Sequence, residues 1–389
     1  MKVGILAPIA PKEIGGGYTF EQEIFHQLLQ LAPQSKHEFV VFEGFRGANN
    51  FGSAPGFRSI SLRRPIWDRL ILRTRRFPWE YKWIDKVLKG EGIQFFLNTT
   101  FEAVTLSIPF SAIVWDLQHR LQPQFSEVSA NGMFEHREQY YSQVLKRAAF
   151  VIVGTEAGKG EVQNFYGVSD EKIRILPHPT PSFALDETAA DSSVLSKYKL
   201  APNYVFYPAQ FWSHKNHPAI LRAVAHLNKM ENLRLPVVFT GSDQGHERAV
   251  RDLVDRLELR DQVFFLGHVS REELKALYQN ALCLCYVSFF GPENLPPLEA
   301  FGLGCPVVAA DVPGASEQLG DAAIRVDPSN DLEIANTLRL LSRDEAKRQE
   351  LINRGKKRAR RFTGPDFAKG LIALLDEFES VRCRPEAAN

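Results

Sequence analysis

Short, continuously apolar runs alternate along this chain with longer segments in which apolar residues recur every three or four positions. The runs predict buried parallel strands, and the longer segments, such as residues 18–31, predict helices that pack on them. In the first half, strands are predicted at residues 3–6, 39–42, 93–97, 111–115, 150–154 and 172–176. In the second half, they are predicted at residues 204–208, 236–241, 262–267, 282–287, 306–311 and 323–326. This order predicts an α/β protein with two doubly wound parallel sheets.

A segment rich in proline, serine, alanine and aspartate interrupts the alternation at residues 178–202. We interpret its later part, 186–202, as a linker between domains. The expected domains are therefore 1–185 and 203–364, and residues 365–389 are expected to form a last helix and a tail.

Composition limits the classes of function. A chain of 389 residues, 44% hydrophobic and 24% charged, can bury two cores. The net charge of +1 provides no general attraction for nucleic acid, so no nucleic-acid partner is expected. The four cysteines do not make a disulfide framework, and Cys283, Cys285 and Cys305 are expected as buried thiols. The first apolar run is too short for a signal peptide, and no run approaches the ~18 residues that span a bilayer, so a soluble, cytoplasmic protein is expected.

The most informative segment follows the strand at 282–287. A loop of glycine, proline and asparagine leads into a helix that begins at Leu295 and Pro296 and carries Glu299 in its early turns. Proline early in a helix costs little, because its missing N–H would have no partner there. The remaining free N–H groups and the helix dipole favour phosphate at such a start. A carboxylate beside bound phosphate suits paired hydroxyls, such as those of a ribose.

The sequence of this segment, VSFFGPENLPPLEAFGLGCPVVAA at 287–310, resembles the nucleotide-sugar signature of the retaining glycosyltransferases of family 4. Most members carry Glu-x7-Glu; here the second glutamate is Glu299, and Gly291 stands in place of the first. A subgroup with F-G-P-x-N-L-P-P-L-E-A departs in the same way. The resemblance covers about residues 1–380 and implies the GT-B fold. In that fold two Rossmann-like domains face a central cleft, and the last helix crosses back to the first domain.

A glycine loop follows the first predicted strand. Gly15, Gly16 and Gly17 would let the backbone approach a ligand closely, although a purely structural turn explains them equally well. The spacing is not that of a dinucleotide fingerprint. The resemblance implies that this loop faces the donor phosphates.

Further candidates for the donor site lie in the second half. Lys215 follows the strand at 204–208, and a lysine is a compact charge suited to phosphate. The resemblance implies that Lys215 grips the diphosphate, with Gln210 where most members have an arginine. It also implies that Gly267 and Val269 present backbone groups to the base, and that Glu293 or Asn294 binds the sugar. His214 and His217 are interpreted as supports of the loop.

The strand at 111–115 ends in the motif D-L-Q-H. The wider family has a sugar-facing histidine where Trp115 stands, so the resemblance makes His119 the best candidate for that ring. Asp116 would orient the loop or bind an acceptor hydroxyl. A loop-packing role for His119 remains the alternative. Thr155 and the pair Ser270 and Glu273 are predicted as helix caps.

Seven arginines and one acidic residue lie between residues 58 and 76, interleaved with aromatic and aliphatic residues. Such a segment suits an anionic membrane surface or a phosphate-bearing lipid acceptor, or else a solvated face of the first domain. The residues named for acceptor or membrane contact are Arg63, Arg64, Arg73 and Arg76.

Taken together, the resemblance implies retaining, metal-independent transfer of a sugar from a nucleotide-diphosphate sugar. A mannose-type GDP-sugar is favoured over a UDP-sugar, with a saccharide or lipid-linked glycan as acceptor, as in polysaccharide or lipopolysaccharide assembly. No metal site and no cofactor are expected, because the nucleotide sugar is a substrate. The expected location is the cytoplasm, with peripheral attachment to the inner face of the plasma membrane as a variant. The alternatives are an inactive nucleotide-sugar-binding or scaffold protein, and an epimerase or phosphorylase of the same architecture.

Overall fold

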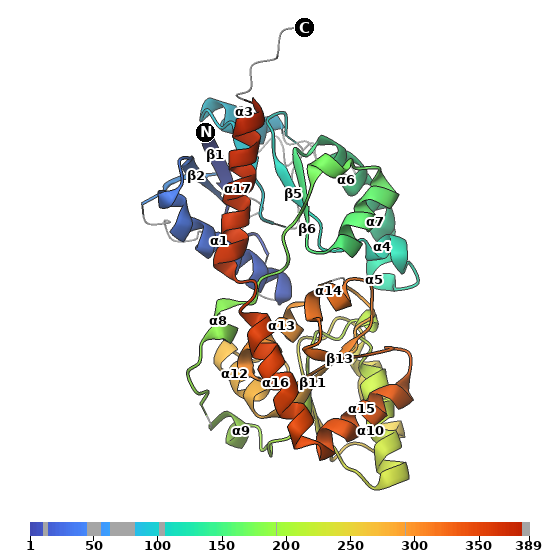
Figure 1. Cartoon of the computed structure of the whole chain (residues 1–389). Coiled ribbons are helices and arrows are strands. Elements are labelled where there is room, and N and C mark those ends of the chain that lie inside the picture. The colour runs from blue at the N-terminus through green and yellow to red at the C-terminus, as the bar shows by residue number, and fades with distance from the viewer. Residues whose placement is uncertain are drawn as a thin grey trace. The chain divides into compact units, whose positions relative to one another are not determined.

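The structure is a computed structural model that describes residues 1–10, 15–44, 56–62, 82–100, 106–191, 193–291 and 293–382 (Figure 1). The chain divides into two compact units. Unit 1 consists of Met1–His119, Asn131–His178 and Gly364–Asn389, and unit 2 consists of Arg120–Ala130 and Pro179–Thr363.

Unit 1 contains parallel strands in the orders β3-β2-β1-β4 and β5-β6-β7, joined by a parallel bridge between Phe96 and Phe110. The strands run through continuous apolar sequence, so both faces of the sheet are covered. Their bounds are β1 Lys2–Leu6, β2 Glu38–Glu43, β3 Arg58–Ser61, β4 Phe95–Leu97, β5 Ser111–Ile113, β6 Phe150–Val153 and β7 Ile173–Ile175. In register, Val3 lies opposite Phe39 on one side and Phe95 on the other.

The helices of unit 1 follow the strands in the alternating order that the sequence predicts. Their bounds are α1 Gly16–Leu31, α3 Lys82–Gly90, α4 Gln118–Leu121, α6 Met133–Arg147, α7 Glu156–Tyr166 and α17 Gly364–Arg382, with α4 at the boundary between the units. The last of these, α17, packs along α1 (Figure 1). There the rings of Phe20 and Phe367 lie 5.4 Å apart, edge to face.

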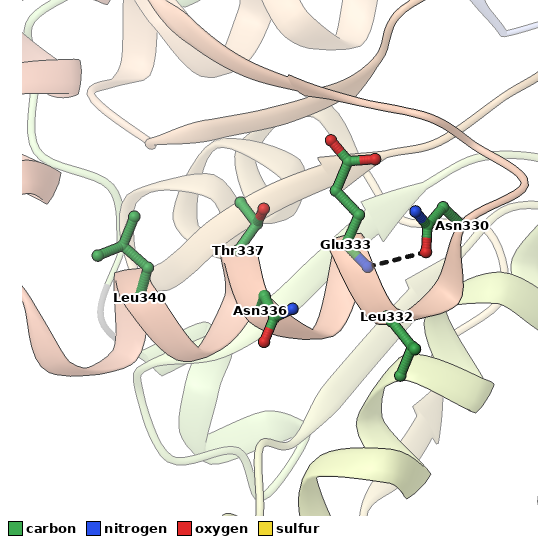
Figure 2. A pocket seen from close by; sticks show the side chains of 6 residues that line it. All are labelled: Asn330, Leu332, Glu333, Asn336, Thr337 and Leu340. Carbon is green, nitrogen blue, oxygen red and sulfur yellow. Dashed lines mark hydrogen bonds between the residues drawn. The ribbon is translucent and has the colours of Figure 1, made fainter.

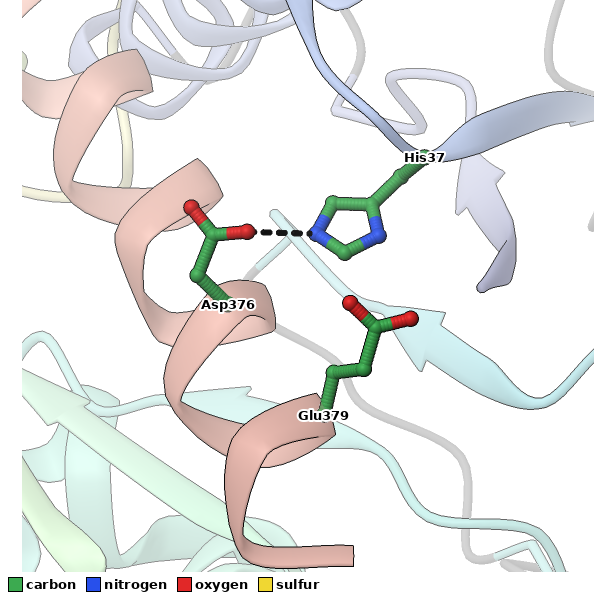
Figure 3. Close-up of side chains that lie close together, drawn as sticks. All are labelled: His37, Asp376 and Glu379. Atoms are coloured by element: carbon green, nitrogen blue, oxygen red, sulfur yellow. Dashed lines mark hydrogen bonds and ion pairs between the residues drawn. The ribbon is translucent and has the colours of Figure 1, made fainter. Parts of the chain in front are cut away.

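Polar contacts also fasten α17 to unit 1. His37, the residue before β2, bonds to Asp376 at 3.1 Å (Figure 3). Glu379 accepts from the amino group of Met1 at 3.0 Å, and Lys36 pairs with both Asp376 and Glu379. His37, Asp376 and Glu379 also form a group that could hold a metal ion. Because the two carboxylates are already neutralised by Lys36 and the terminal amine, we interpret the group as a helix fastening.

Unit 2 contains one parallel six-stranded sheet in the order β10-β9-β8-β11-β12-β13. Its strands are β8 Tyr204–Pro208, β9 Val237–Thr240, β10 Val263–Phe265, β11 Ala281–Tyr286, β12 Val307–Ala310 and β13 Ala323–Val326. The strand order reverses between β8 and β11, and in doubly wound sheets ligands bind beyond the carboxyl ends of the strands at such a point.

Helices cover both faces of this sheet. The bounds are α5 Ser126–Ser129, α8 Ser182–Leu185, α9 Ser193–Lys197, α10 His217–Glu231, α11 Glu247–Arg256, α12 Arg271–Gln279, α13 Leu295–Leu303, α14 Ala315–Leu319, α15 Asp331–Arg343 and α16 Glu345–Ala359. Helix α10 packs on α15, and α13 packs on α16 and α8. The approach of α13 to α8 is close, since a side chain at Gly302 would lie 2.4 Å from the carbonyl oxygen of Ala184.

All twelve predicted strands are present, and the fold class is confirmed. The sequence missed β3, because its residues RSIS form a mostly exposed edge strand without an apolar run. The units also divide differently from the predicted domains. The chain passes between units at residues 119/120, 130/131, 178/179 and 363/364. Most of the predicted linker packs in unit 2, where Lys275 binds Asp186 at 3.0 Å. Residues 120–130 join unit 2 because their side chains pack there.

Cys283, Cys285 and Cys305 are buried free thiols, as predicted. Over the described parts of the chain, no helix is both long and apolar enough to cross a membrane.

Candidate functional site

The loops that follow β8 and β11 bring the predicted phosphate-binding residues of unit 2 together. Lys215 ends a short turn, and its ammonium donates to the Tyr286 hydroxyl at 2.9 Å. The Tyr286 hydroxyl in turn donates to Oδ1 of Asn294, the residue before α13, at 3.0 Å. The motifs around Lys215 and Asn294, far apart in sequence, are therefore linked by one hydrogen-bonded chain. Tyr286 had no sequence signal, since it is the last residue of an apolar strand.

Backbone contacts hold Lys215 in place. The Tyr207 hydroxyl donates to the Lys215 carbonyl at 2.6 Å. The next residue, Asn216, has a φ of 57° and donates from its side chain to the carbonyls of Val287 and Pro328 at 3.2 and 2.7 Å. Lys215 itself is half-buried, and among the described residues no carboxylate pairs with it. This is a fixed, partly enclosed positive charge.

Several hydrogen bonds fix Asn294, the residue before α13. The Asn294 side chain donates to the carbonyls of Phe290 and Gly291, at 3.2 and 3.3 Å. Its backbone N–H and C=O both bond to the Gln318 side chain at 3.0 Å. A small cavity lies here, lined partly by Tyr286, Asn294, Pro297 and Gln318.

The same geometry explains the departure at Gly291. Its φ is 101°, a conformation that residues with a side chain rarely adopt. A Cβ atom at this position would lie 2.8 Å from Nδ2 of Asn294. A glutamate at position 291 would therefore need a strained backbone and a shift of the Asn294 amide.

Glu299 lies deeper, on the side of α13 that faces α12. Its carboxylate is buried and accepts from the Tyr278 hydroxyl at 2.9 Å. Burial raises the pKa of Glu299 to about 7, against the opposing effects of the Tyr278 bond and the charge of Arg271. The role at a ribose stays a prediction. Glu293 is also buried, beside Asn294, and its role toward the sugar stays a prediction as well.

Gln210 is held by its neighbours. Its amide donates to the Ser242 hydroxyl at 3.2 Å and accepts from the Trp212 indole at 3.0 Å. Gly267 and Val269 follow β10; Gly267 is exposed and its carbonyl accepts from the Gly241 N–H at 2.8 Å. Their contacts with a base stay predictions.

In unit 1, the glycine loop leads into α1. Gly15 has a φ of 69°, and Gly16 and Gly17 begin the helix. The buried carboxylate of Glu21 accepts from the N–H groups of Ile9 and Ala10, at 2.8 and 2.9 Å. The carboxylate thus fixes the backbone of the loop that follows β1. The sequence did not indicate this role.

Asp116 and His119 lie beyond the carboxyl end of β5 and are both engaged. Asp116 pairs with Arg137 at 2.5 Å. Burial opposes the charge on Asp116, but the charge and hydrogen bond of Arg137, together with the bond from the Gln118 N–H, lower the pKa of this carboxyl. His119 is fully buried; its Nε2 lies 2.8 Å from Glu138 and 3.1 Å from the Tyr166 hydroxyl. This setting favours the packing interpretation, and the catalytic role of His119 stays a prediction.

Trp115, where the wider family has a histidine, contacts Phe20 of α1 at 5.5 Å between ring centroids. The ring of His178 lies 4.7 Å from that of Phe20. Burial lowers the pKa of His178 to about 4, so this ring is neutral near pH 7. Thr155 caps α7 and Ser270 caps α12, as predicted.

Two other features stand apart from these loops. A hollow of about 400 Å³ runs along α15 and is lined only by Asn330 and residues of that helix (Figure 2). It brings no groups together from different elements. The four arginines predicted to contact an acceptor or membrane, Arg63, Arg64, Arg73 and Arg76, lie outside the described residues.

The structure thus has two α/β units, and in the second unit the loops after β8 and β11 lie together at the start of α13. Residues 195–358 match the family model "Glycosyl transferases group 1". This segment of the chain is therefore similar to the glycosyl transferases group 1, in agreement with the predicted resemblance, while the subgroup motifs stay a prediction.

Curated relatives agree with this assignment. The chain is 27% identical over 231 residues to "O-antigen chain mannosyltransferase B" of Escherichia coli, covering 59% of this chain and 60% of that protein. It is 30% identical over 219 residues to an N-acetyl-D-galactosaminyltransferase of Campylobacter jejuni whose name specifies an undecaprenol-diphosphate-linked acceptor, covering 54% and 56%. The chain thus spans less than two thirds of the length of these relatives.

A solved structure supports the fold over almost the whole chain. It is a sucrose-phosphate synthase from Thermosynechococcus elongatus, with a TM-score of 0.73 and 17% identity over 98% of this chain and 99% of that one.

Proposed function

We propose that this protein is a glycosyltransferase that moves a hexose from a nucleotide-diphosphate sugar to a saccharide or lipid-linked glycan, with retention at the anomeric carbon. The observation that carries the proposal is the chain from Lys215 through Tyr286 to Asn294, where the strand order of unit 2 reverses. It places a half-buried cation, without a carboxylate partner among the described residues, at the start of α13. An anionic group on the ligand would complete the pairing of this cation.

The chemistry follows from where charge develops. The bond between the anomeric carbon and the diphosphate oxygen breaks, and the bond to the acceptor oxygen forms on the same face. The acceptor proton moves to the leaving diphosphate. The growing negative charge is stabilised by Lys215, by the dipole of α13 and by the N–H of Leu295, since Pro296 and Pro297 carry none. Such preorganised electrostatics is usually the largest catalytic contribution. The proposed mechanism therefore uses protein groups and no metal ion.

A mannose-type GDP-sugar is the favoured donor, because the Escherichia coli relative is named a mannosyltransferase. A UDP-sugar is the second choice. The name of the Campylobacter relative supports a lipid-linked glycan among the acceptors.

A second candidate function is binding of a nucleotide sugar without transfer. Two observations favour it: glycine stands at position 291 in place of the usual glutamate, and Gln210 replaces a charged residue with an amide already bonded to Ser242. An epimerase or phosphorylase would share the donor contacts but differ in product.

The test is a screen of GDP- and UDP-sugars with the full chain, read by nucleotide release and by product analysis, with and without EDTA. We expect release from a GDP-sugar that rises with a glycan acceptor and is unchanged by EDTA. Tight nucleotide binding without release would support the binding protein. Loss of activity with EDTA that Mg²⁺ restores would contradict the metal-free mechanism. No binding of GDP or UDP at all would overturn the proposal.

A further inference from the structure

A short segment of the chain contacts both loops of the candidate donor site. Residues 120–130 are flanked on both sides by unit 1, yet they pack within unit 2. We name them the strap. Their contacts fall on the loop that contains Lys215 and on the loop that follows β11, so the strap touches the elements that form the Lys215–Tyr286–Asn294 chain.

The strongest contact joins Glu127 of the strap to His214. One carboxylate oxygen of Glu127 lies 2.6 Å from Nδ1 of His214 and accepts from the His214 backbone N–H at 2.9 Å. Both side chains are at most 10% exposed. Burial raises the pKa of Glu127, but the bonds from His214 outweigh it and hold that pKa at about 2. Glu127 is therefore ionised at neutral pH. It forms hydrogen bonds with both the side chain and the backbone of His214, the residue before Lys215.

Aromatic rings of the strap and of the two loops also pack together. The His214 ring stacks on Phe290 with 3.8 Å between centroids and 9° between planes. Phe125 of the strap meets Phe290 edge to face at 5.2 Å and lies 5.6 Å from Phe289. Gln122 donates to the Phe289 carbonyl at 3.0 Å. The His214 carbonyl accepts from the Phe289 N–H at 2.9 Å, which ties the two loops to each other.

We propose that Glu127 is a positioning residue of the donor site: by fixing His214 it holds the Lys215 ammonium against Tyr286, where the diphosphate would bind. The inference rests on the proposed function. The residue acts through His214 and Lys215 and does not itself touch substrate. Because one carboxylate restrains both the ring and the backbone of His214, its removal frees the turn Ser213–Lys215 at two points.

The test compares Glu127→Ala and Glu127→Gln in the full chain, with Glu231→Gln as the matched control. Glu231 also lies in unit 2 and binds Arg339 and Arg343 at 3.0 and 2.8 Å, on helices away from the loops. In ligand-free protein, amide hydrogen exchange across residues 209–216 should become about tenfold faster in Glu127→Ala, and less so in Glu127→Gln, which keeps an acceptor. The control should leave this segment unchanged. Unchanged exchange in both Glu127 variants would overturn the proposal.

A double-mutant cycle tests whether Glu127 affects nucleotide binding through Lys215. GDP or UDP, whichever binds the wild-type chain, is titrated by calorimetry. Glu127→Gln alone should weaken binding by about fivefold to tenfold, and it should have little further effect in the Lys215→Ala background. Equal effects in both backgrounds would show that Glu127 does not act through Lys215. If neither nucleotide binds the wild-type chain, the proposed function fails, while the exchange experiment still tests the hold of Glu127 on the loop.

Discussion

The carboxyl ends of the two sheets carry polar side chains in different states. In unit 1, Asp116 is paired with Arg137, and His119 is enclosed with Glu138 and Tyr166. In unit 2, Lys215 and Asn294 meet through Tyr286, and the described residues supply no carboxylate to Lys215. Buried polar groups are nearly always satisfied within the protein. A half-buried charge left without a counter-charge is therefore the better indication of a ligand site.

Replacing Lys215 should have the largest effect. Lys215→Ala should lower turnover by about 10²–10³, because one preorganised contact to the leaving group is lost. Steady-state nucleotide release measures this. Lys229→Ala, an exposed lysine on α10, is the control. If turnover in Lys215→Ala stays within a few-fold of wild type, Lys215 does not stabilise the leaving group.

Glu299 is expected to have the next largest effect. Charge-assisted hydrogen bonds are worth about 1.5–3 kcal/mol each, so Glu299→Gln should weaken nucleotide binding by about 10-fold to 100-fold. Calorimetry with free GDP and UDP measures it. Because the pKa of Glu299 is raised to about 7 by burial, nucleotide affinity in the wild type should also rise with pH around neutrality. Unchanged affinity in the variant would exclude the ribose role.

His119 tests the other half of the comparison. If the ring only packs, His119→Ala should lower the free energy of unfolding by about 1–3 kcal/mol, because Glu138 and Tyr166 lose a partner. Donor hydrolysis per folded molecule should then change little. Tyr166→Phe, which removes one hydroxyl from the same group, should be milder. A loss of turnover of about 100-fold with unchanged thermal unfolding would instead establish the catalytic role.

At neutral pH the smallest expected effect is that of His217, which contributes to the pH dependence of stability only in acid. Burial lowers the pKa of His217 to about 3 from an ordinary value of 6.5, so the unfolded chain binds a proton that the folded chain excludes. Stability from this group is complete above pH 6.5 and falls as pH drops toward 3, by up to about 1.4 kcal/mol per pH unit. His217→Phe, which can keep the stack on Phe211, should flatten the dependence of unfolding on pH. His268→Gln, at an exposed position, should not. Identical slopes in wild type and His217→Phe would contradict this account.

The strands were predictable because parallel strands are buried on both faces, so each one appears in the sequence as an apolar run of its own. The edge strand β3 was not, since RSIS has a mostly exposed pattern. Within the site, Lys215, Asn294 and Glu299 were identified because each stands next to a strand end or helix start, where spacing along the chain already determines position.

The partners of these residues were decided by the tertiary structure alone. Tyr286, Tyr278 and Glu127 stand in a strand, a helix and a remote segment, with nothing in the local pattern to mark them. The obstruction at Gly291 likewise depends on how the Asn294 amide folds back. Local sequence determines backbone conformation and the burial of apolar runs. Hydrogen bonds between side chains distant in sequence depend on packing that brings their atoms within about 3 Å, and no periodicity along the chain encodes that distance.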